Sequence, residues 1–223
     1  MNKDDLIKNP RVIVEGFYDE EGQNTSEYDE SHQHRYQNTI KWLSKFKIEN
    51  QVVCDMGCGT GFVLKQLSDN NTAIGIDGAK FESCDKITRY QANFDYDRFS
   101  EMIPVSDVNH MLCFETFEHL TNPYNFILEC KKMIKPNGYY HITYPTLTIQ
   151  HNTFYPSLLW PKNNFIQFME QMAFELVVSM TMPTRFGGVH AFTFRNKSWE
   201  NIKMKFPKDD EYKHYPPHVQ VNI

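Results

Sequence analysis

Short apolar runs alternate with longer amphipathic segments through the middle of this chain, and this pattern predicts strands joined by helices. Such alternation is typical of a parallel sheet built from crossover units. The predicted strands are 51–55, 73–77, 107–113 and 138–144, and the predicted intervening helices are 60–68, 80–87 and 123–133.

The same pattern extends to both sides of this region. A helix is expected before the first strand, because Tyr36, Ile40 and Leu43 lie at helical spacing. The Lys-Pro-Asn-Gly segment at 135–138 should end a helix and turn the chain. Gly187-Gly188 is expected to form a hairpin loop, so the last strand should run antiparallel to its neighbour. The final predicted elements are a helix at 163–172 and strands at 174–182 and 189–195.

The chain length of 223 residues fits one folded domain, and its 40% apolar content is enough to fill one core. We expect a polar lead segment at 1–30, the domain at 31–200 and a tail at 201–223. No window approaches the roughly 18 to 20 uninterrupted apolar residues that cross a bilayer, and the polar N-terminus is unlike a secretory signal. A cytoplasmic protein that does not contact membranes is therefore expected.

Charge and cysteine content restrict the classes of partner. A formal net charge of −5 argues against a large nucleic-acid interface, which needs clustered Lys and Arg. The five cysteines lack the paired spacing of a disulfide framework and are expected to be reduced thiols. Cys54 and Cys58 resemble half of a zinc site, but no second pair follows, so small packed residues are the preferred interpretation.

The most informative stretch is Asp55-Met56-Gly57-Cys58-Gly59-Thr60-Gly61, where an apolar strand runs into a glycine-rich turn and then a helix. Glycines at these positions permit a tight turn and a close approach of the backbone to a ligand. The spacing alone is also close to a dinucleotide fingerprint, which leaves a nicotinamide-dependent reductase open.

This segment resembles the first motif of class I S-adenosylmethionine-dependent methyltransferases, and four further segments between about 50 and 195 match that family in order. The resemblance implies an α/β fold with a single Rossmann-like domain. Its seven-stranded sheet would have six parallel strands and an antiparallel last strand, with helices on both faces. It also implies that S-adenosylmethionine is the cofactor and S-adenosylhomocysteine the product. The positions that it assigns to cofactor binding are Asp55, Gly57, Cys58, Gly59, Gly61, Asp77, Gly78, Asn93, Phe94 and Phe114.

Two of these positions have alternatives. Asp77 ends a strand about 20 residues after the glycine turn, where a carboxylate can accept from both ribose hydroxyls, although an Asp there could instead cap a helix. Asn93 stands where the family usually has Asp, followed at Phe94 by a residue whose backbone amide meets the adenine. Asn93 could still bind the base through its side-chain carbonyl.

The segment from Glu115 to His119 follows the predicted strand 107–113 and resembles the family's fourth motif. Reacting groups gather at the carboxyl ends of strands in open α/β sheets. One interpretation makes His119 a general base for the acceptor hydroxyl, with Glu115 or Glu118 fixing its tautomer.

Two other interpretations of these three residues remain open. Resemblance to ubiquinone-pathway O-methyltransferases and terminal-ribose RNA methyltransferases implies that they bind a divalent cation, with His151 as a possible fourth ligand. In a third interpretation, Glu118-His119 begins a helix and serves capping and packing only. Of these, we predict a catalytic role without a metal.

The acceptor is expected to be a small molecule or a sugar, methylated on oxygen. The first predicted helix resembles that of methyltransferases in surface-glycan and small-molecule pathways, such as polysaccharide biosynthesis, and Arg35 on it could bind the cofactor carboxylate. Aromatic residues from Tyr144 to Trp160 could form a lid over a planar acceptor. A non-catalytic nucleoside-binding subunit is the alternative from another class, and a monomer or homodimer is expected.

Overall fold

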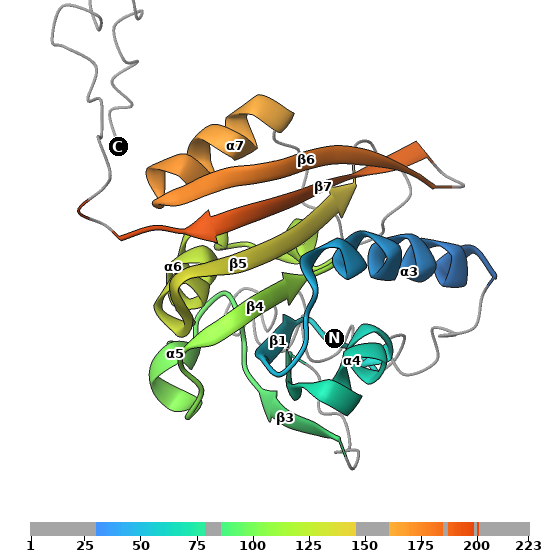
Figure 1. The fold of residues 1–223 in the computed structure, drawn as a ribbon. Coiled ribbons are helices and arrows are strands. Elements are labelled where there is room, and N and C mark those ends of the chain that lie inside the picture. Colours follow the sequence, from blue (N-terminus) through green and yellow to red (C-terminus); the bar gives the residue numbers. More distant parts are fainter. Residues whose placement is uncertain (1–29, 79–85, 146–160, 185–186, 199, 201–223) are drawn as a thin grey trace, which may run out of the picture.

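The computed structural model describes residues 30–78, 86–145, 161–184, 187–198 and 200. Seven strands form one sheet in the order β3-β2-β1-β4-β5-β7-β6 (Figure 1). β7 runs antiparallel to both β5 and β6, and the other neighbouring pairs are parallel, which confirms six strands in one direction and one reversed. The strands are β1 Val52–Met56, β2 Thr72–Asp77, β3 Ile87–Gln91, β4 Val108–Cys113, β5 Ile134–Pro145, β6 Phe174–Thr184 and β7 Gly187–Asn196.

Helices cover both faces of this sheet, as expected for a Rossmann-like domain (Figure 1). On one face, α5, α6 and α7 pack on the larger apolar cluster, and on the other face α3 and α4 pack on two smaller ones. The helices are α3 Glu30–Leu43, α4 Phe62–Leu67, α5 Phe99–Met102, α6 Pro123–Met133 and α7 Lys162–Gln171, with short 3-10 turns at Ser44–Phe46, Ser68–Asn70 and Phe117–His119.

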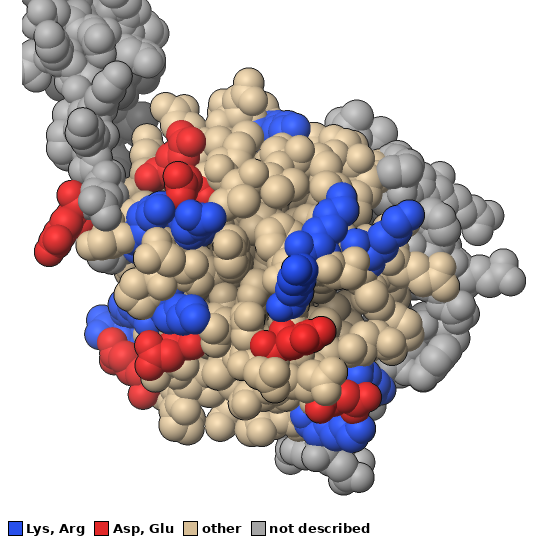
Figure 2. Space-filling model, in the orientation of Figure 1, with Lys and Arg blue, Asp and Glu red and all other residues tan. Residues whose placement is uncertain are grey.

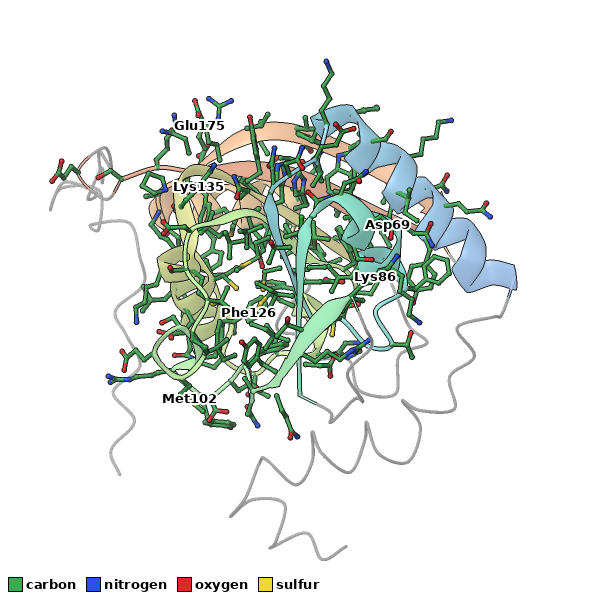
Figure 3. All side chains as sticks on the ribbon, turned by 60° about the horizontal axis from the view of Figure 1, so that its bottom comes forward. Asp69, Lys86, Met102, Phe126, Lys135 and Glu175 are labelled. Carbon is green, nitrogen blue, oxygen red and sulfur yellow. The ribbon has the colours of Figure 1, made fainter. Side chains whose placement is uncertain are left out.

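The central strands read as continuous apolar runs because both of their faces are buried. In β1, Val53 packs on the side of α3 and α4, whereas Cys54 and Met56 pack on the opposite side. Phe126 of α6 is fully buried in the larger cluster, while Met102 at the end of α5 remains 60% exposed (Figure 3). Because β1, β2, β3 and β4 run parallel, their carboxyl ends meet at one edge of the sheet.

The prediction of a helix over 80–87 is wrong at its end, because Ile87 begins strand β3, which the sequence pattern did not reveal. β3 is an edge strand with only its first residue buried, so its sequence Ile-Thr-Arg-Tyr-Gln lacks the apolar run of the central strands. Residues 79–85 lie outside the described part of the chain.

Two predicted turns lie inside strands. β5 already begins at Ile134, and the Lys-Pro-Asn-Gly segment forms an irregularity in its pairing with β4, with Asn137 at a φ of 62°. Gly187 and Gly188 belong to β7, where they pair with Thr184 and Pro183. The hairpin itself is confirmed, but its connecting residues are 185 and 186, which the structure does not describe.

The surface carries charges of both signs. Figure 2 shows Lys and Arg interspersed with Asp and Glu on the visible face, without a continuous basic field. Asp69 and Lys86 form one of the exposed ion pairs (Figure 3). Within the described residues, no helix has both the length and the apolar character that a membrane span requires.

Candidate cofactor and acceptor site

The turn after β1 has the backbone geometry that its glycines predict. Gly57, Gly59 and Gly61 have φ values of 76°, 51° and 82°, a region that side-chain-bearing residues rarely adopt. The turn is held to β2 by the N–H of Gly57, which donates to the carbonyl of Ile76 at 2.8 Å. A Cβ atom built on Gly59 would meet nothing within 4 Å, so the middle of the turn borders open space that a ligand can approach.

Gly57 and Gly59 differ in what surrounds them, which leads to a testable difference. A Cβ on Gly57 would lie 2.0 Å from Oγ1 of Thr116, so Gly57→Ala adds a steric clash to backbone strain. We expect it to lower the free energy of unfolding by about 2 to 4 kcal/mol. Gly59→Ala introduces strain alone and should cost about 1 kcal/mol. Urea unfolding of both variants measures the two losses, and equal losses would contradict the contact between Thr116 and the turn.

Asp55 is buried near the end of β1, with an exposed fraction of 4%. The pKa of its carboxyl group is raised to about 7, chiefly by burial and also by the nearby Asp77, while Arg89 acts in the opposite direction. Its Oδ1 atom has no hydrogen-bond partner among the described residues. A buried carboxylate with an unmet acceptor suits a positively charged donor such as an ammonium group.

Asp77 ends β2 and is also 4% exposed. Its Oδ2 atom accepts a hydrogen bond from the N–H of Gly59 at 2.8 Å, which ties it to the glycine turn. Gly78 follows and accepts a hydrogen bond from Nε2 of Gln91 through its carbonyl. The predicted ribose-binding carboxylate therefore lies beside the predicted nucleoside turn. The helix predicted at 80–87, which Asp77 could instead have capped, falls mostly outside the described residues.

Arg89 on β3 was missed by the sequence analysis. Its guanidinium group donates from Nη1 to the carbonyl of Gly59 at 2.7 Å and from Nη2 to the carbonyl of Thr60 at 2.6 Å. Because β3 itself was not predicted, no local signal placed this side chain at the turn. The tertiary structure brings together three charged groups from three adjacent strands: Asp55, Asp77 and Arg89.

Asn93 lies two residues after β3 and is buried. Its side-chain carbonyl accepts a hydrogen bond from the N–H of Asp95 at 3.1 Å, whereas Nδ2 lacks a partner among the described residues. The side-chain carbonyl thus has one lone pair still available, and Nδ2 is a donor available to the base, so contact between Asn93 and the adenine stays a prediction. The ring of Phe94 packs against Phe99 and Phe126 in the core, which leaves only its backbone for contact with a ligand.

Cys58 and Phe114 frame the glycine turn and the end of β4. Burial raises the pKa of the Cys58 thiol well above its ordinary value, and so it stays protonated. Phe114 is half-buried and contacts Trp42 of α3 edge-on, with ring centroids 6.0 Å apart. The side chain of Arg35, also on α3, lies outside the described part of the chain.

Glu115 has an unusual backbone for a glutamate, with a φ of 53°. Thr143 of β5 holds it at two points: its hydroxyl accepts from the N–H of Glu115 at 3.2 Å and donates to Oε1 at 2.9 Å. Strained residues of this kind persist only where their surroundings fix them, and they are frequent at functional sites. The Glu115 carboxylate is therefore held in place at the carboxyl end of β4.

Glu118 and His119 lie in the 3-10 turn Phe117–His119, where Oε1 of Glu118 is 3.9 Å from Nε2 of His119. The glutamate side chain is buried, and the histidine side chain is 16% exposed. This turn precedes α6, whose N-cap is Asn122, so neither residue begins the helix. The interpretation that this pair caps a helix is therefore wrong for α6, and packing is the structural alternative to catalysis.

The loop that carries these residues is joined to the loop after β3. Asp95 is buried, and its Oδ1 atom accepts hydrogen bonds from the backbone N–H groups of Thr121 and Asn122 at 2.8 and 2.7 Å. The candidate adenine segment and the candidate reacting segment thus have a fixed spacing.

The remaining candidate residues are those predicted as metal ligands or as an aromatic lid over the acceptor. Among the described residues, no three His, Cys, Asp or Glu side chains gather in a group that could hold a metal ion. His151, the fourth metal candidate, lies outside the described residues. Tyr144 is buried among Phe165, Phe192 and His190 and so cannot belong to an exposed lid, and the rest of the proposed lid, from 146 to 160, is not described.

A family model described as "Methyltransferase domain" matches residues 28–203 of the chain. The search of curated proteins found no match to the sequence of this chain.

Solved structures match by fold at low sequence identity. The magnesium protoporphyrin IX methyltransferase of Synechocystis PCC 6803 is 12% identical with a TM-score of 0.66, covering 84% of this chain and 100% of its own. The 1,6-didemethyltoxoflavin-N1-methyltransferase of Burkholderia thailandensis is 11% identical with a TM-score of 0.68, covering 89% and 92%. The cyclase SpnF is 13% identical with a TM-score of 0.59, covering 78% and 85%. At these low sequence identities, the similarity shows a shared fold and nothing more.

Proposed function

Because the chain belongs to the methyltransferase domain family and is an S-adenosylmethionine-dependent enzyme, we propose that it methylates an oxygen atom of a small-molecule or sugar acceptor at the carboxyl edge of β1 and β4. The observation that carries this proposal is the buried carboxylate of Asp55 with its unmet Oδ1, next to a glycine turn that faces open space. Family membership favours this cofactor over a nicotinamide dinucleotide.

The proposed cofactor contacts follow from the charge and geometry of the site. Asp55 would hold the ammonium of the methionine moiety, the glycine turn would wrap this end of the molecule, and Asp77 would accept from the ribose hydroxyls. Asn93 and the backbone of Phe94 would meet the adenine. When bound, S-adenosylmethionine supplies an activated methyl group on its sulfonium.

The proposed acceptor contacts lie on the loop after β4. His119 would take the proton from an acceptor hydroxyl, with Glu118 stabilising the charged imidazole, and Glu115 would orient the acceptor from its fixed position beside Thr143. Alignment supplies much of the rate in such a displacement, which suits a loop held to both β5 and the segment after β3. The fold neighbours named for porphyrin and toxoflavin methylation support a small organic acceptor.

The first test separates cofactor binding from catalysis. Calorimetric titration should show that the protein binds S-adenosylhomocysteine, and incubation of S-adenosylmethionine with a panel of hydroxylated acceptors should release S-adenosylhomocysteine. Binding without turnover on any acceptor would favour the alternative of a non-catalytic nucleoside-binding subunit. No binding at all would refute the proposal.

Asp77→Ala should weaken the binding of S-adenosylhomocysteine by about 1 to 3 kcal/mol, the range for hydrogen bonds to a charged group. The loss combines the ribose contacts with the contact between Asp77 and Gly59. Asp77→Asn is the matched control, since its side-chain carbonyl can still accept from Gly59, and it should lose less. Unchanged affinity in Asp77→Ala would remove this residue from the nucleoside site.

A further inference from the structure

Arg89 contacts the side of the glycine turn that faces β3. Its two terminal nitrogens span the consecutive carbonyls of Gly59 and Thr60, at 2.7 and 2.6 Å. A guanidinium group has the planar fork that matches such a pair of acceptors, whereas an ammonium group binds as a point charge. The contact therefore fixes the orientation of two peptide groups in the turn.

The peptide groups around Gly59 are held on both sides by charged side chains. The N–H of Gly59 donates to Oδ2 of Asp77, and its carbonyl accepts from Arg89. The space for this arrangement depends on Gly61, where a Cβ atom would lie 2.7 Å from Nη2 of Arg89. The glycine at 61 thus admits the guanidinium group in addition to its φ of 82°.

Arg89 also supplies charge to a site with two buried carboxylates. Asp55 and Asp77 lie on neighbouring strands, and Asp77 raises the pKa of Asp55, while Arg89 lowers it. The buried thiols nearby remain protonated, because burial raises the pKa of each one. Among the described residues, the titratable or charged groups that interact electrostatically with Asp55 include Cys54 on β1, Cys58 in the turn, Asp77 on β2, Arg89 on β3 and Cys113 on β4.

We propose that Arg89 is a positioning residue that shapes the glycine turn for the nucleoside and supplies the positive charge that balances the carboxylates of Asp55 and Asp77. The inference rests on the proposed function, because it assumes that Asp55 binds the ammonium of the cofactor. Arg89 itself acts from behind the turn through the backbone carbonyls and through its charge.

Two variants separate the charge of Arg89 from its hydrogen bonds. Arg89→Lys keeps the charge and loses the fork, while Arg89→Gln keeps a donor and loses the charge. The binding of S-adenosylhomocysteine is titrated calorimetrically from pH 5.5 to 8.5 for both variants and the native protein, with circular dichroism to verify folding. In the native protein, affinity should rise with pH through the Asp55 pKa of about 7, because the ionised carboxylate binds the ammonium.

In Arg89→Gln we expect a loss of affinity of about tenfold or more at pH 7, with the rise in affinity moved to higher pH. Arg89→Lys should retain the native pH midpoint with a smaller loss. A pH midpoint that is the same in the native protein and Arg89→Gln would overturn the charge role, whatever the change in affinity. Native protein that fails to bind S-adenosylhomocysteine at any pH would instead overturn the proposed function, and this inference with it.

Discussion

Asp55→Asn is expected to make the protein more stable at pH 8 while removing its affinity for S-adenosylhomocysteine. The carboxyl group has a pKa of about 7 in the folded chain against 3.8 as its ordinary value, chiefly because it is buried. Between these two values the folded state keeps a proton that the unfolded state has released. The free energy of unfolding therefore falls as pH rises through this window and stays low above it.

An amide at this position carries no charge to desolvate, so the variant escapes this loss. The gain at pH 8 should be about 1 to 4 kcal/mol and should shrink toward pH 5, where the native carboxyl group is protonated. Urea unfolding at the two pH values measures it, and calorimetry measures the loss of binding. Asp69→Asn is the matched control, because the Asp69 side chain is 70% exposed and has no proposed part in cofactor binding. A gain that is the same at pH 5 and pH 8 would contradict the raised pKa.

His119→Ala is expected to reduce turnover by about 10²- to 10⁴-fold, the usual contribution of a general base, with the affinity for S-adenosylhomocysteine retained. The histidine lies after β4 and is partly exposed, 3.9 Å from the buried Glu118 carboxylate. That distance is longer than a hydrogen bond, and such pairs commonly shorten when substrate binds. The rate is measured as S-adenosylhomocysteine release with an acceptor that the native enzyme converts.

Two controls identify the role of this pair. Glu118→Gln should reduce turnover less than His119→Ala, because the imidazole remains and only its stabilising charge is lost. Activity that is lost on chelation and restored by magnesium would support metal-assisted transfer in place of base catalysis. Full activity of His119→Ala would exclude His119 from the mechanism.

Most elements of the fold were predictable because their signals are local. The helix at 123–133 was predicted with the bounds that the structure gives, since Pro123 begins it and its apolar residues recur at helical spacing. β1, β2 and β4 were recognisable as buried apolar runs. β3 was not, because an edge strand needs few apolar residues, and the turn at 135–138 was absorbed into β5 by its pairing with β4.

The candidate site, like the fold, could be predicted from the sequence only in part. A glycine turn between a buried strand and a helix has few uses, so the residues from Asp55 to Gly61 alone indicated a nucleotide-binding site, and with the family resemblance they indicated a methyltransferase. The engaged carbonyl of Asn93 and the burial of Tyr144 could not be predicted, because both depend on the residues that surround them in space.

The sequence by itself determined the order of the elements, the position of the nucleoside turn and the segment of candidate reacting residues, since each follows from periodicity or from a short motif. Only the tertiary structure decided how the charges are balanced. Asp55, Asp77 and Arg89 come from three strands, and Thr143 reaches Glu115 from β5. Their distances depend on strand order and burial, and these are properties of the assembled sheet that no stretch of the chain carries alone.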